Sequence, residues 1–441
     1  MLDDVNSSVS RFVPQDMVTS VVQAINFFNT EVASIHTVKD MWTIAPVDLN
    51  EITTFPTCFA YGLLVFVTGS RIVRSPSTEQ SSRALLTQLR LHQYRLELTR
   101  ALNDELGYEK SRLSMFTLGA IILILQITIN GLASAEWQLH YRATWTLINT
   151  RGGFRQELNG PALEELFEML IIGYVAKCTS PSLQQLTCLP DLRDLDLIMQ
   201  AYSFGVHPAF TCPAPLFAEM IRINDHRRRK ALLQQQESER HHPVNQANAY
   251  TNETQLKILE GAVARQQRDM VVAETVALLT CVLNFQLAEW AQEKDAGRGC
   301  YDAWLRQGRV NISAIVIFAI LSLPMSPDET RERDLPAGWN AQERAGLCAE
   351  YTSLLAAELV HVLQKSDHLD MSLCWPAIAL GVSAAGGPPA HQGVVSQFLL
   401  RLGKEHGTVA PYKANEVLQR FWQSGKASWD DCFDRPYAFF T

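Results

Sequence analysis

The chain has 441 residues, of which 47% are hydrophobic and 19% are charged. This balance excludes an intrinsically disordered chain and is sufficient for one large apolar core or two closely apposed ones. Lys and Arg number 38 against 46 Asp and Glu, a net charge of -8, whereas a domain that grips a phosphate backbone usually presents a basic surface. The charge therefore argues against direct binding to nucleic acid.

Apolar residues recur at helical spacing along nearly the whole chain, which predicts an all-α fold, an irregular multi-helix bundle with a large apolar core. The predicted helices, in chain order, cover residues 16–36, 80–106, 111–130, 134–150, 161–178, 214–238, 254–293, 310–323, 341–365, 371–385, 391–405 and 413–424. The polar stretch 234–255 and the proline-containing stretch 325–340 predict surface loops. We expect an N-terminal helical extension over 1–60 and a helical domain over 61–435, which contains the polar loop at 234–255.

The N-terminal sequence MLDDVNSSVSRFVPQDM shows neither a secretory signal nor a transit peptide. The longest apolar run, 115–129, is interrupted by polar residues and is shorter than the roughly 20 residues needed to span a bilayer. We therefore expect a cytoplasmic protein without a membrane span.

The nine cysteines are scattered, and no two of them have the close spacing of a zinc site or a redox pair. They are Cys58, Cys178, Cys188, Cys212, Cys281, Cys300, Cys348, Cys374 and Cys432. We expect reduced thiols in the core and no bound zinc.

Several stretches carry a resemblance to a known family. The segment LGAIILILQITINGLASAEWQLHYRATWTLI (118–148) is followed in order by Pro215-Leu216-Phe217, by Leu373-Cys374-Trp375-Pro376 with Gly381, and by Phe421-Trp422 with Trp429-Asp430. Together they cover most of 110–435 and resemble the fungal-specific transcription factor domain, the regulatory body of zinc-cluster factors. The resemblance implies a helical bundle that, in its relatives, follows a cysteine-rich DNA-binding module and is thought to sense ligands or partners. This chain departs from the pattern because residues 1–60 contain only Cys58, so we expect no DNA recognition through a zinc cluster.

Two groups of charged residues are candidates for binding a diphosphate with its metal ion. Asp191 and Asp194 would share a helix face, and Asp225 follows later; carboxylates of this kind bind Mg²⁺, a hard cation that prefers oxygen ligands. Arg228 and Lys230, in a dense cationic cluster, and the more distant Lys294 are candidates for the diphosphate itself. The same residues also fit an acidic helix start and a solvated helix end.

A second group of residues is a candidate wall for an apolar pocket. Glu274 lies in the apolar stretch MVVAETVALLTCVLNFQLAEW, where a carboxylate is either at the edge of the stripe or buried with a partner. Phe285 falls near the same helix face, Trp290 follows it, and Trp137 begins another helix. These residues fit either a catalytic pocket or ordinary helix packing.

The chain has no motif for acyl transfer, zinc hydrolysis or nucleotide loops. In size, all-α character and missing motifs it is similar to the unconventional humulene-type sesquiterpene cyclases of fungi. We therefore favour a Mg²⁺-dependent sesquiterpene cyclase of secondary metabolism, acting on farnesyl diphosphate in a hydrophobic pocket. The alternative is a nuclear, ligand-sensing transcriptional regulator or coregulator without its own zinc cluster. Either reading implies a small hydrophobic or isoprenoid ligand and leaves a homodimer open.

Overall fold

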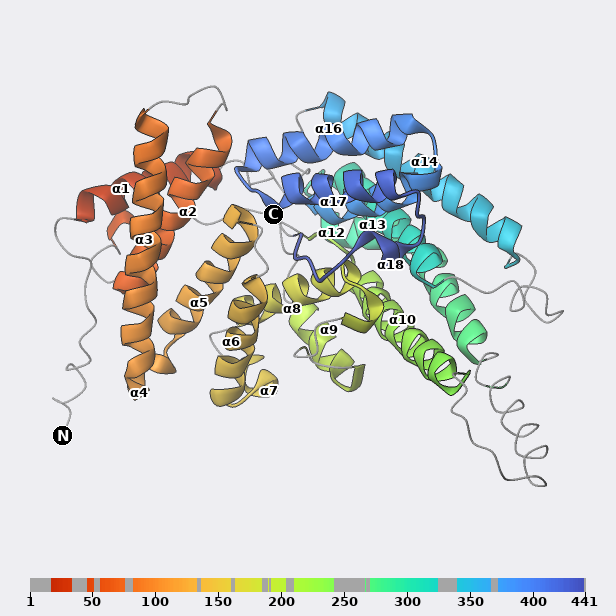
Figure 1. Ribbon diagram of the computed structural model, residues 1–441, viewed down its shortest axis with the longest axis horizontal. Helices are drawn as coiled ribbons and strands as arrows, with labels where there is room; N and C mark the ends of the chain where they lie inside the picture. The colour runs from red at the N-terminus through yellow and green to blue at the C-terminus, as the bar shows by residue number, and fades with distance from the viewer. Residues whose placement is uncertain are drawn as a thin grey trace.

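The computed structural model describes residues 17–33, 46–50, 56–75, 82–132, 136–159, 163–184, 189, 192–203, 210–241, 266, 270–323, 339–365 and 372–439. Helices joined by turns and short connections make up this part of the chain, and it contains no β-strand (Figure 1). The predicted all-α fold is confirmed. Asp191, Cys188 and residues 242–265 and 324–338, on which some predictions fall, lie outside the described residues.

The N-terminal helices form one end of the molecule, at the left of Figure 1. They are α1 (Val18–Phe27), which continues as the π-helical segment Phe28–Val32, α2 (Thr57–Arg74), α3 (Ser82–Gly107), the short α4 (Glu109–Arg112) and α5 (Met115–Ile127). The apolar sequence of α2 buries Leu63, Leu64 and Val67 in a small core shared with α1. The hydroxyl of Ser114 begins α5 by accepting a hydrogen bond from Thr117 N at 3.1 Å.

The middle of the chain contains a π-helical segment, Thr128–Leu132, then α6 (Trp137–Thr150), α7 (Phe154–Glu157), α8 (Leu163–Cys178), the 3₁₀ turns Ser182–Gln184 and Leu192–Asp194, α9 (Leu195–Ser203) and α10 (Ala214–His241). Helix α6 buries Trp137, Tyr141 and Trp145 on one face. The Tyr141 hydroxyl donates a hydrogen bond to Met169 O of α8 at 2.9 Å. This bond fixes α6 against α8.

The C-terminal half begins with the helix Met270–Leu283. It continues with α12 (Leu287–Asp295), α13 (Tyr301–Ser322), α14 (Ala341–Gln364), α15 (Cys374–Ser383) with the turn Ala384–Gly386, α16 (Pro389–His406), α17 (Ala410–Ser424) and α18 (Trp429–Cys432). Helix α13 is the central element, because it packs against α10, α12, α14, α15 and α18. The Phe318 ring of α13 lies 6.1 Å from Trp375 and 4.7 Å from Trp429. Motif residues far apart in sequence therefore meet in one core.

Two predicted helix boundaries are wrong. The predicted helix 254–293 breaks after Leu283, where the chain bends by 46° before Leu287. Helix α13 begins at Tyr301, not at 310, because Trp304 packs against Trp290 of α12 at 5.6 Å and buries a turn that carries charged residues. Helix α2 was not predicted, and it contains residue 60, where the N-terminal extension was expected to end.

By length and composition, Tyr301–Ser322 and Ala341–Gln364 are long and apolar enough to cross a membrane. In the first, 72% of the apolar window is buried inside the protein, as expected of a core helix, and in the second 28%. Among the large apolar side chains of α14, Leu354 is exposed, at 50%.

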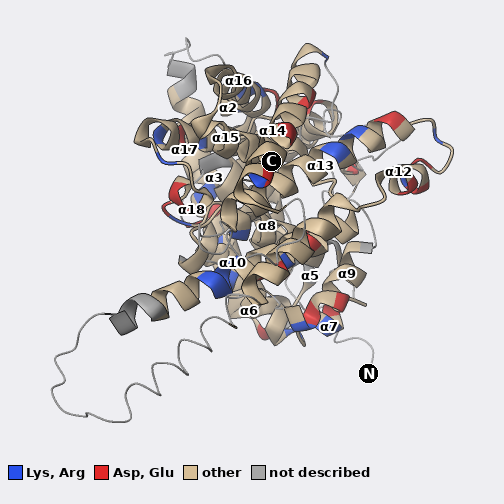
Figure 2. Cartoon of the chain, turned by 90° about the vertical axis from the view of Figure 1, so that its right-hand side faces the viewer, with Lys and Arg blue, Asp and Glu red and all other residues tan. Residues whose placement is uncertain are grey.

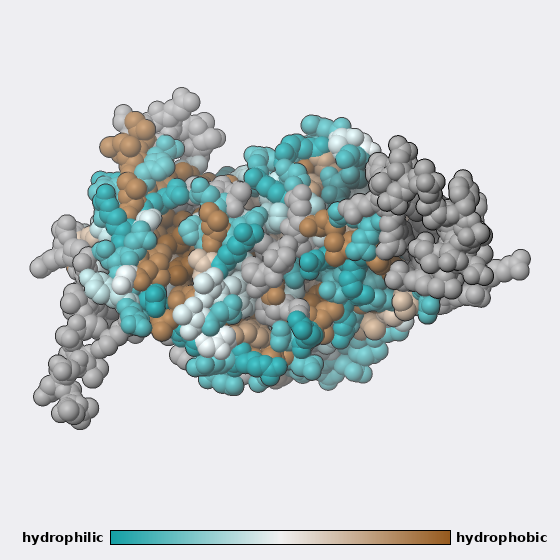
Figure 3. All heavy atoms as spheres, turned by 60° about the horizontal axis from the view of Figure 1, so that its bottom comes forward, coloured by the Kyte–Doolittle hydropathy of each residue, from teal (hydrophilic) through white to brown (hydrophobic). Residues whose placement is uncertain are grey.

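Helix α3 also exposes apolar side chains. Leu85, Leu89 and Leu96 are 60%, 56% and 60% exposed, and their spacing places them on one face. Buried Leu98 marks the opposite face, which packs toward α2. On the side of the molecule seen in Figure 3, apolar surface gathers at the left, where the N-terminal helices lie, between polar residues.

Candidate functional site

One cavity in the described part of the chain is an open groove between α13, α14 and the α15–α16 connection, with a volume of about 630 Å³. Ile320, Val382, Pro388 and the small side chains of α14 make most of its wall apolar. This volume is within the range of about 300–1,000 Å³ that is typical of sites for small molecules. Among the described residues that line it, Arg344 and His391 are the ionisable groups besides the Cys348 thiol.

Arg344 connects the groove to the end of α13. Its side chain is 7% exposed, and Nη2 donates hydrogen bonds to Leu323 O at 2.9 Å and Ile320 O at 3.3 Å. A cation at a helix C-terminus satisfies carbonyls that have no partner within the helix. Asn340 and Glu343 form a capping box that begins α14. Local sequence therefore places Arg344 on the groove wall.

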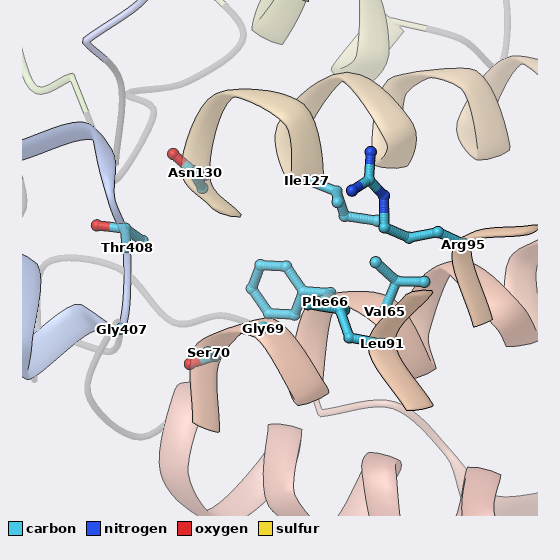
Figure 4. A pocket seen from close by; sticks show the side chains of 10 residues that line it. All are labelled: Val65, Phe66, Gly69, Ser70, Leu91, Arg95, Ile127, Asn130, Gly407 and Thr408. Atoms are coloured by element: carbon cyan, nitrogen blue, oxygen red, sulfur yellow. The ribbon is translucent and has the colours of Figure 1, made fainter. Parts of the chain in front are cut away.

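The second cavity is small, about 30 Å³, and lies between α2, α3, the end of the π-helical segment Thr128–Leu132 and the α16–α17 turn (Figure 4). Phe66 and Ile127 provide its apolar wall, and Ser70, Asn130 and Thr408 its polar wall. It has room for about two water-sized particles. Neither cavity has a carboxylate among the described residues that line it.

The cationic cluster of α10 does not act as one group, because successive helical residues point in different directions. Arg227, which was not a candidate, is 2% exposed. Its Nε donates to Asp430 Oδ1 at 2.8 Å, and Nη1 donates to Lys177 O at 3.2 Å. Nη2 donates to Ser180 O and Asp430 Oδ1. Arg227 thus ties α8, α10 and α18 together.

The neighbouring candidates have different surroundings. Arg228 is exposed, whereas Lys230 is 8% exposed. Lys294 is on α12, which packs against α13 and lies on the opposite side of Figure 2 from the outer end of α10. The structure therefore does not bring the three predicted diphosphate ligands to one place.

Asp225 and Glu274 both bind the side chain of Arg229 and do not form a metal site with each other. Arg229 donates to Asp225 Oδ2 at 2.7 Å and to Glu274 Oε2 at 3.1 Å. Burial by itself would raise the pKa of Glu274, but Arg229 and His226 hold this pKa below its usual value. Asp194 lies in a separate 3₁₀ turn before α9. In the described part of the chain, no group of three or more His, Cys, Asp or Glu side chains is arranged to hold a metal ion.

His226 completes this cluster on the inner side of α10. Nδ1 lies 3.0 Å from Glu274 Oε2, and Nε2 lies 2.9 Å from Thr275 Oγ1. Burial lowers the pKa of His226 below its usual value, while Glu274 acts in the opposite direction. The cluster joins α10 to the helix Met270–Leu283.

The predicted aromatic wall is divided between two cores. Trp137 belongs to the main core and lies 5.8 Å from Tyr141, edge to face. Trp290 and Phe285 pack in a small cluster with Trp304 of α13. None of these three aromatic residues lines the groove or the small cavity.

Sequence reasoning missed Arg344, His391 and Asp430. The capping pattern Asn340-x-x-Glu343 is visible in the sequence as a helix start, and it also marks Arg344 as a residue of the first turn. Nothing in the local sequence indicates that His391 borders a groove or that Asp430 reaches a side chain 203 residues away.

The geometry thus defines a helical body with an open apolar groove and charged clusters that join helices. Comparisons with known proteins agree with it. Residues 73–280 match the family described as the fungal specific transcription factor domain. This part of the chain is similar to that family, in agreement with the sequence resemblance.

One relative extends the similarity. The "Phomenoic acid biosynthesis cluster-specific transcriptional regulator" of Leptosphaeria maculans is 28% identical over 346 residues, 77% of this chain. The chain covers 57% of that protein's length. No solved structure matches the chain significantly.

These findings overturn the favoured function. Both the family and the relative are transcriptional regulators, so the predictions of an enzyme and of a sesquiterpene cyclase are wrong. The cyclase reading relied on a general likeness in size and all-α character, and a helical regulator has both. The expected cytoplasmic location has no support from the comparisons. The magnesium prediction and the roles given to individual site residues remain untested.

Proposed function

We propose that this chain is the regulatory body of a fungal transcriptional regulator of a biosynthetic gene cluster, and that it acts in the nucleus. The observation that carries the proposal is the similarity over 77% of the chain to a protein named as a cluster-specific transcriptional regulator. Because the net charge of the chain is -8, we assign these residues a role in regulation and not in contact with DNA.

We also propose that the groove between α13 and α14 binds a small, mainly hydrophobic effector. Its volume of about 630 Å³ and its apolar wall support this role, because sites of this kind combine apolar walls with a few polar groups that orient the ligand. Arg344 and His391 are such polar groups on this wall.

A reporter experiment tests the regulatory role and the nuclear location. The chain is fused to a heterologous DNA-binding domain in a fungal host, and transcription is compared with the DNA-binding domain alone. We expect a change of several-fold in reporter output and nuclear accumulation of a fluorescent fusion. An unchanged reporter together with a cytoplasmic fusion would contradict the regulator.

Two variants on one helix test the groove. Ala349 lines it, whereas Ala357 is exposed on α14 and is not part of its wall. Ala349→Trp should fill the groove, so that reporter output no longer changes with growth conditions. Ala357→Trp should behave as the wild type. If both variants respond normally, the groove is not the effector site, although the regulator proposal stands.

A second copy of the chain is a further proposed partner. The exposed stripe of Leu85, Leu89 and Leu96 on α3 has the spacing of a helix-pairing face. An antiparallel pair would place Leu85 opposite Leu96, whereas a parallel pair would bring Arg95 near Arg100 of the second copy. Sedimentation should show a dimer that Leu89→Glu dissociates; a monomeric wild type would rule it out.

A further inference from the structure

The junction between α2 and the α16–α17 turn contains buried polar atoms without hydrogen-bond partners. They are Ser70 Oγ, Thr408 Oγ1, Asn130 Oδ1 and two nitrogens of Arg74, Nε and Nη2. Ser70 and Thr408 are each 5% exposed. Buried polar groups are nearly always satisfied by protein, water or an ion, so a cluster of unsatisfied atoms indicates an occupant.

These atoms surround one place. Ser70, Asn130 and Thr408 line the cavity of about 30 Å³, and in Figure 4 their side-chain oxygens lie on the side of the view where Gly407 is. Gly407 connects Arg74 to the group, because a Cβ built on this glycine would overlap Ser70 Oγ and lie 2.9 Å from Arg74 Nε.

The unsatisfied groups favour an occupant that accepts hydrogen bonds over one that donates them. Both Arg74 nitrogens can only donate, and the two hydroxyls can donate as well. The carbonyl oxygen and amide nitrogen of Asn130 can exchange places by a flip of the side chain. A negatively charged acceptor would therefore satisfy all of them together, whereas each water molecule brings two hydrogens that need acceptors.

The charged side chains around the cavity also favour an anion, because they are positive. Arg95 lines the cavity from α3, and Arg71 and Arg74 both lie over the Phe27 ring, at 4.4 and 5.7 Å. Glu31 is the carboxylate that acts on Arg74, and it is exposed. The cavity also adjoins the start of α17, whose dipole favours an anion.

We propose that this junction binds a small inorganic anion of the size of chloride. About 30 Å³ accommodates one such ion but not a phosphate group with its four oxygens. The bound ion would hold the N-terminal helix α2 to the C-terminal helices α16 and α17, so the mutual packing of the two ends depends on it. This inference is independent of the proposed regulatory function.

The test uses the full chain in sodium chloride and in sodium gluconate at equal ionic strength. We expect the melting temperature to rise with the logarithm of the chloride concentration and to stay constant in gluconate. Ser70→Ala and Thr408→Val should weaken the dependence on chloride at least several-fold. Thr144→Val is the matched control, because Thr144 is equally buried but its hydroxyl already donates to His140 O at 2.8 Å.

Diffraction from crystals soaked in bromide identifies the occupant directly. An anomalous peak within hydrogen-bond distance of Ser70 Oγ and Arg74 Nε would support the proposal. No peak, together with equal melting temperatures in chloride and gluconate, would overturn it and leave the cavity to water.

Discussion

Arg227 of α10 and Asp430 of α18 are 203 residues apart in sequence, yet Arg227 Nε donates a hydrogen bond to Asp430 Oδ1 at 2.8 Å. The arginine side chain is 1% exposed and the aspartate side chain 38%. Trp429, next to Asp430, donates from Nε1 to Cys178 O at 2.6 Å. The C-terminal turn is thus fixed to α8 and α10 by one buried cation and one indole.

Removal of this cation should destabilise the fold. In Arg227→Met, the carbonyls of Lys177 and Ser180 lose a buried donor, so we expect the free energy of unfolding to fall by about 2–4 kcal/mol. Urea denaturation measures the change. Arg228→Met, one position along and exposed, should change stability by less than about 0.5 kcal/mol. Equal effects of the two variants would disprove the role of Arg227.

Gly407 should tolerate no side chain. It ends α16 with φ of 67°, and a Cβ there would overlap Ser70 Oγ. Gly425 has φ of 70° at the end of α17 but nothing within 4 Å of the same position. Gly407→Ala should therefore cost about 1–3 kcal/mol more than Gly425→Ala, as measured by thermal unfolding. Similar losses in both would mean that the α16–α17 turn can move away from α2.

His226 should make the fold sensitive to mild acid. Because burial lowers the pKa of His226 below the usual 6.5, the unfolded chain binds more protons than the folded chain between the folded-state pKa and about pH 6.5. Stability is therefore present above about pH 6.5 and is lost as the pH falls toward the folded-state pKa. His226→Gln should lose less stability than the wild type between about pH 7.5 and 5.5.

Urea midpoints at the two pH values give this difference for each protein. The exposed His92 provides the control, because His92→Gln should keep the pH dependence of the wild type. If His226→Gln also keeps it, another group causes the acid sensitivity.

Among the described cysteines, Cys281 should react first with thiol reagents. It is exposed, whereas burial raises the pKa of Cys178 and of Cys374 to about 12. Alkylation at about pH 8 requires thiolate and access, so peptide mass spectrometry of the native protein should show Cys281 labelled more than about tenfold faster than these two. Denaturation in urea should equalise the rates. Early labelling of Cys178 in the native protein would contradict the described core.

Much of the helical architecture could be predicted from the sequence. Apolar periodicity is a local signal, and α6, α8, α10 and α14 begin or end within a few residues of the predicted positions. The Asn340 and Glu343 capping box was visible in the sequence because it depends on residues three apart. The family resemblance agrees with the match over residues 73–280. Its motif residues Trp375 and Trp429 lie outside that match, and both pack against Phe318 in the core.

The candidate site could not be predicted in the same way. Four consecutive cations, Arg227 to Lys230, look alike in sequence, and of these Arg228 and Lys230 were predicted to bind a diphosphate. Only tertiary packing turns Arg227 inward to Asp430 and pairs Arg229 with Glu274. The grouping of Ser70, Arg74, Asn130 and Thr408 likewise exists only where α2 meets the α16–α17 turn.

The sequence by itself determined the all-α class, most helices and the resemblance to the family, because local periodicity and core motifs encode them. Tertiary structure decided which charged and polar groups are buried, which of them are paired, and where the groove and the small cavity lie. The physical reason is that burial and pairing depend on partners tens to hundreds of residues away, and helical spacing carries no information about those partners.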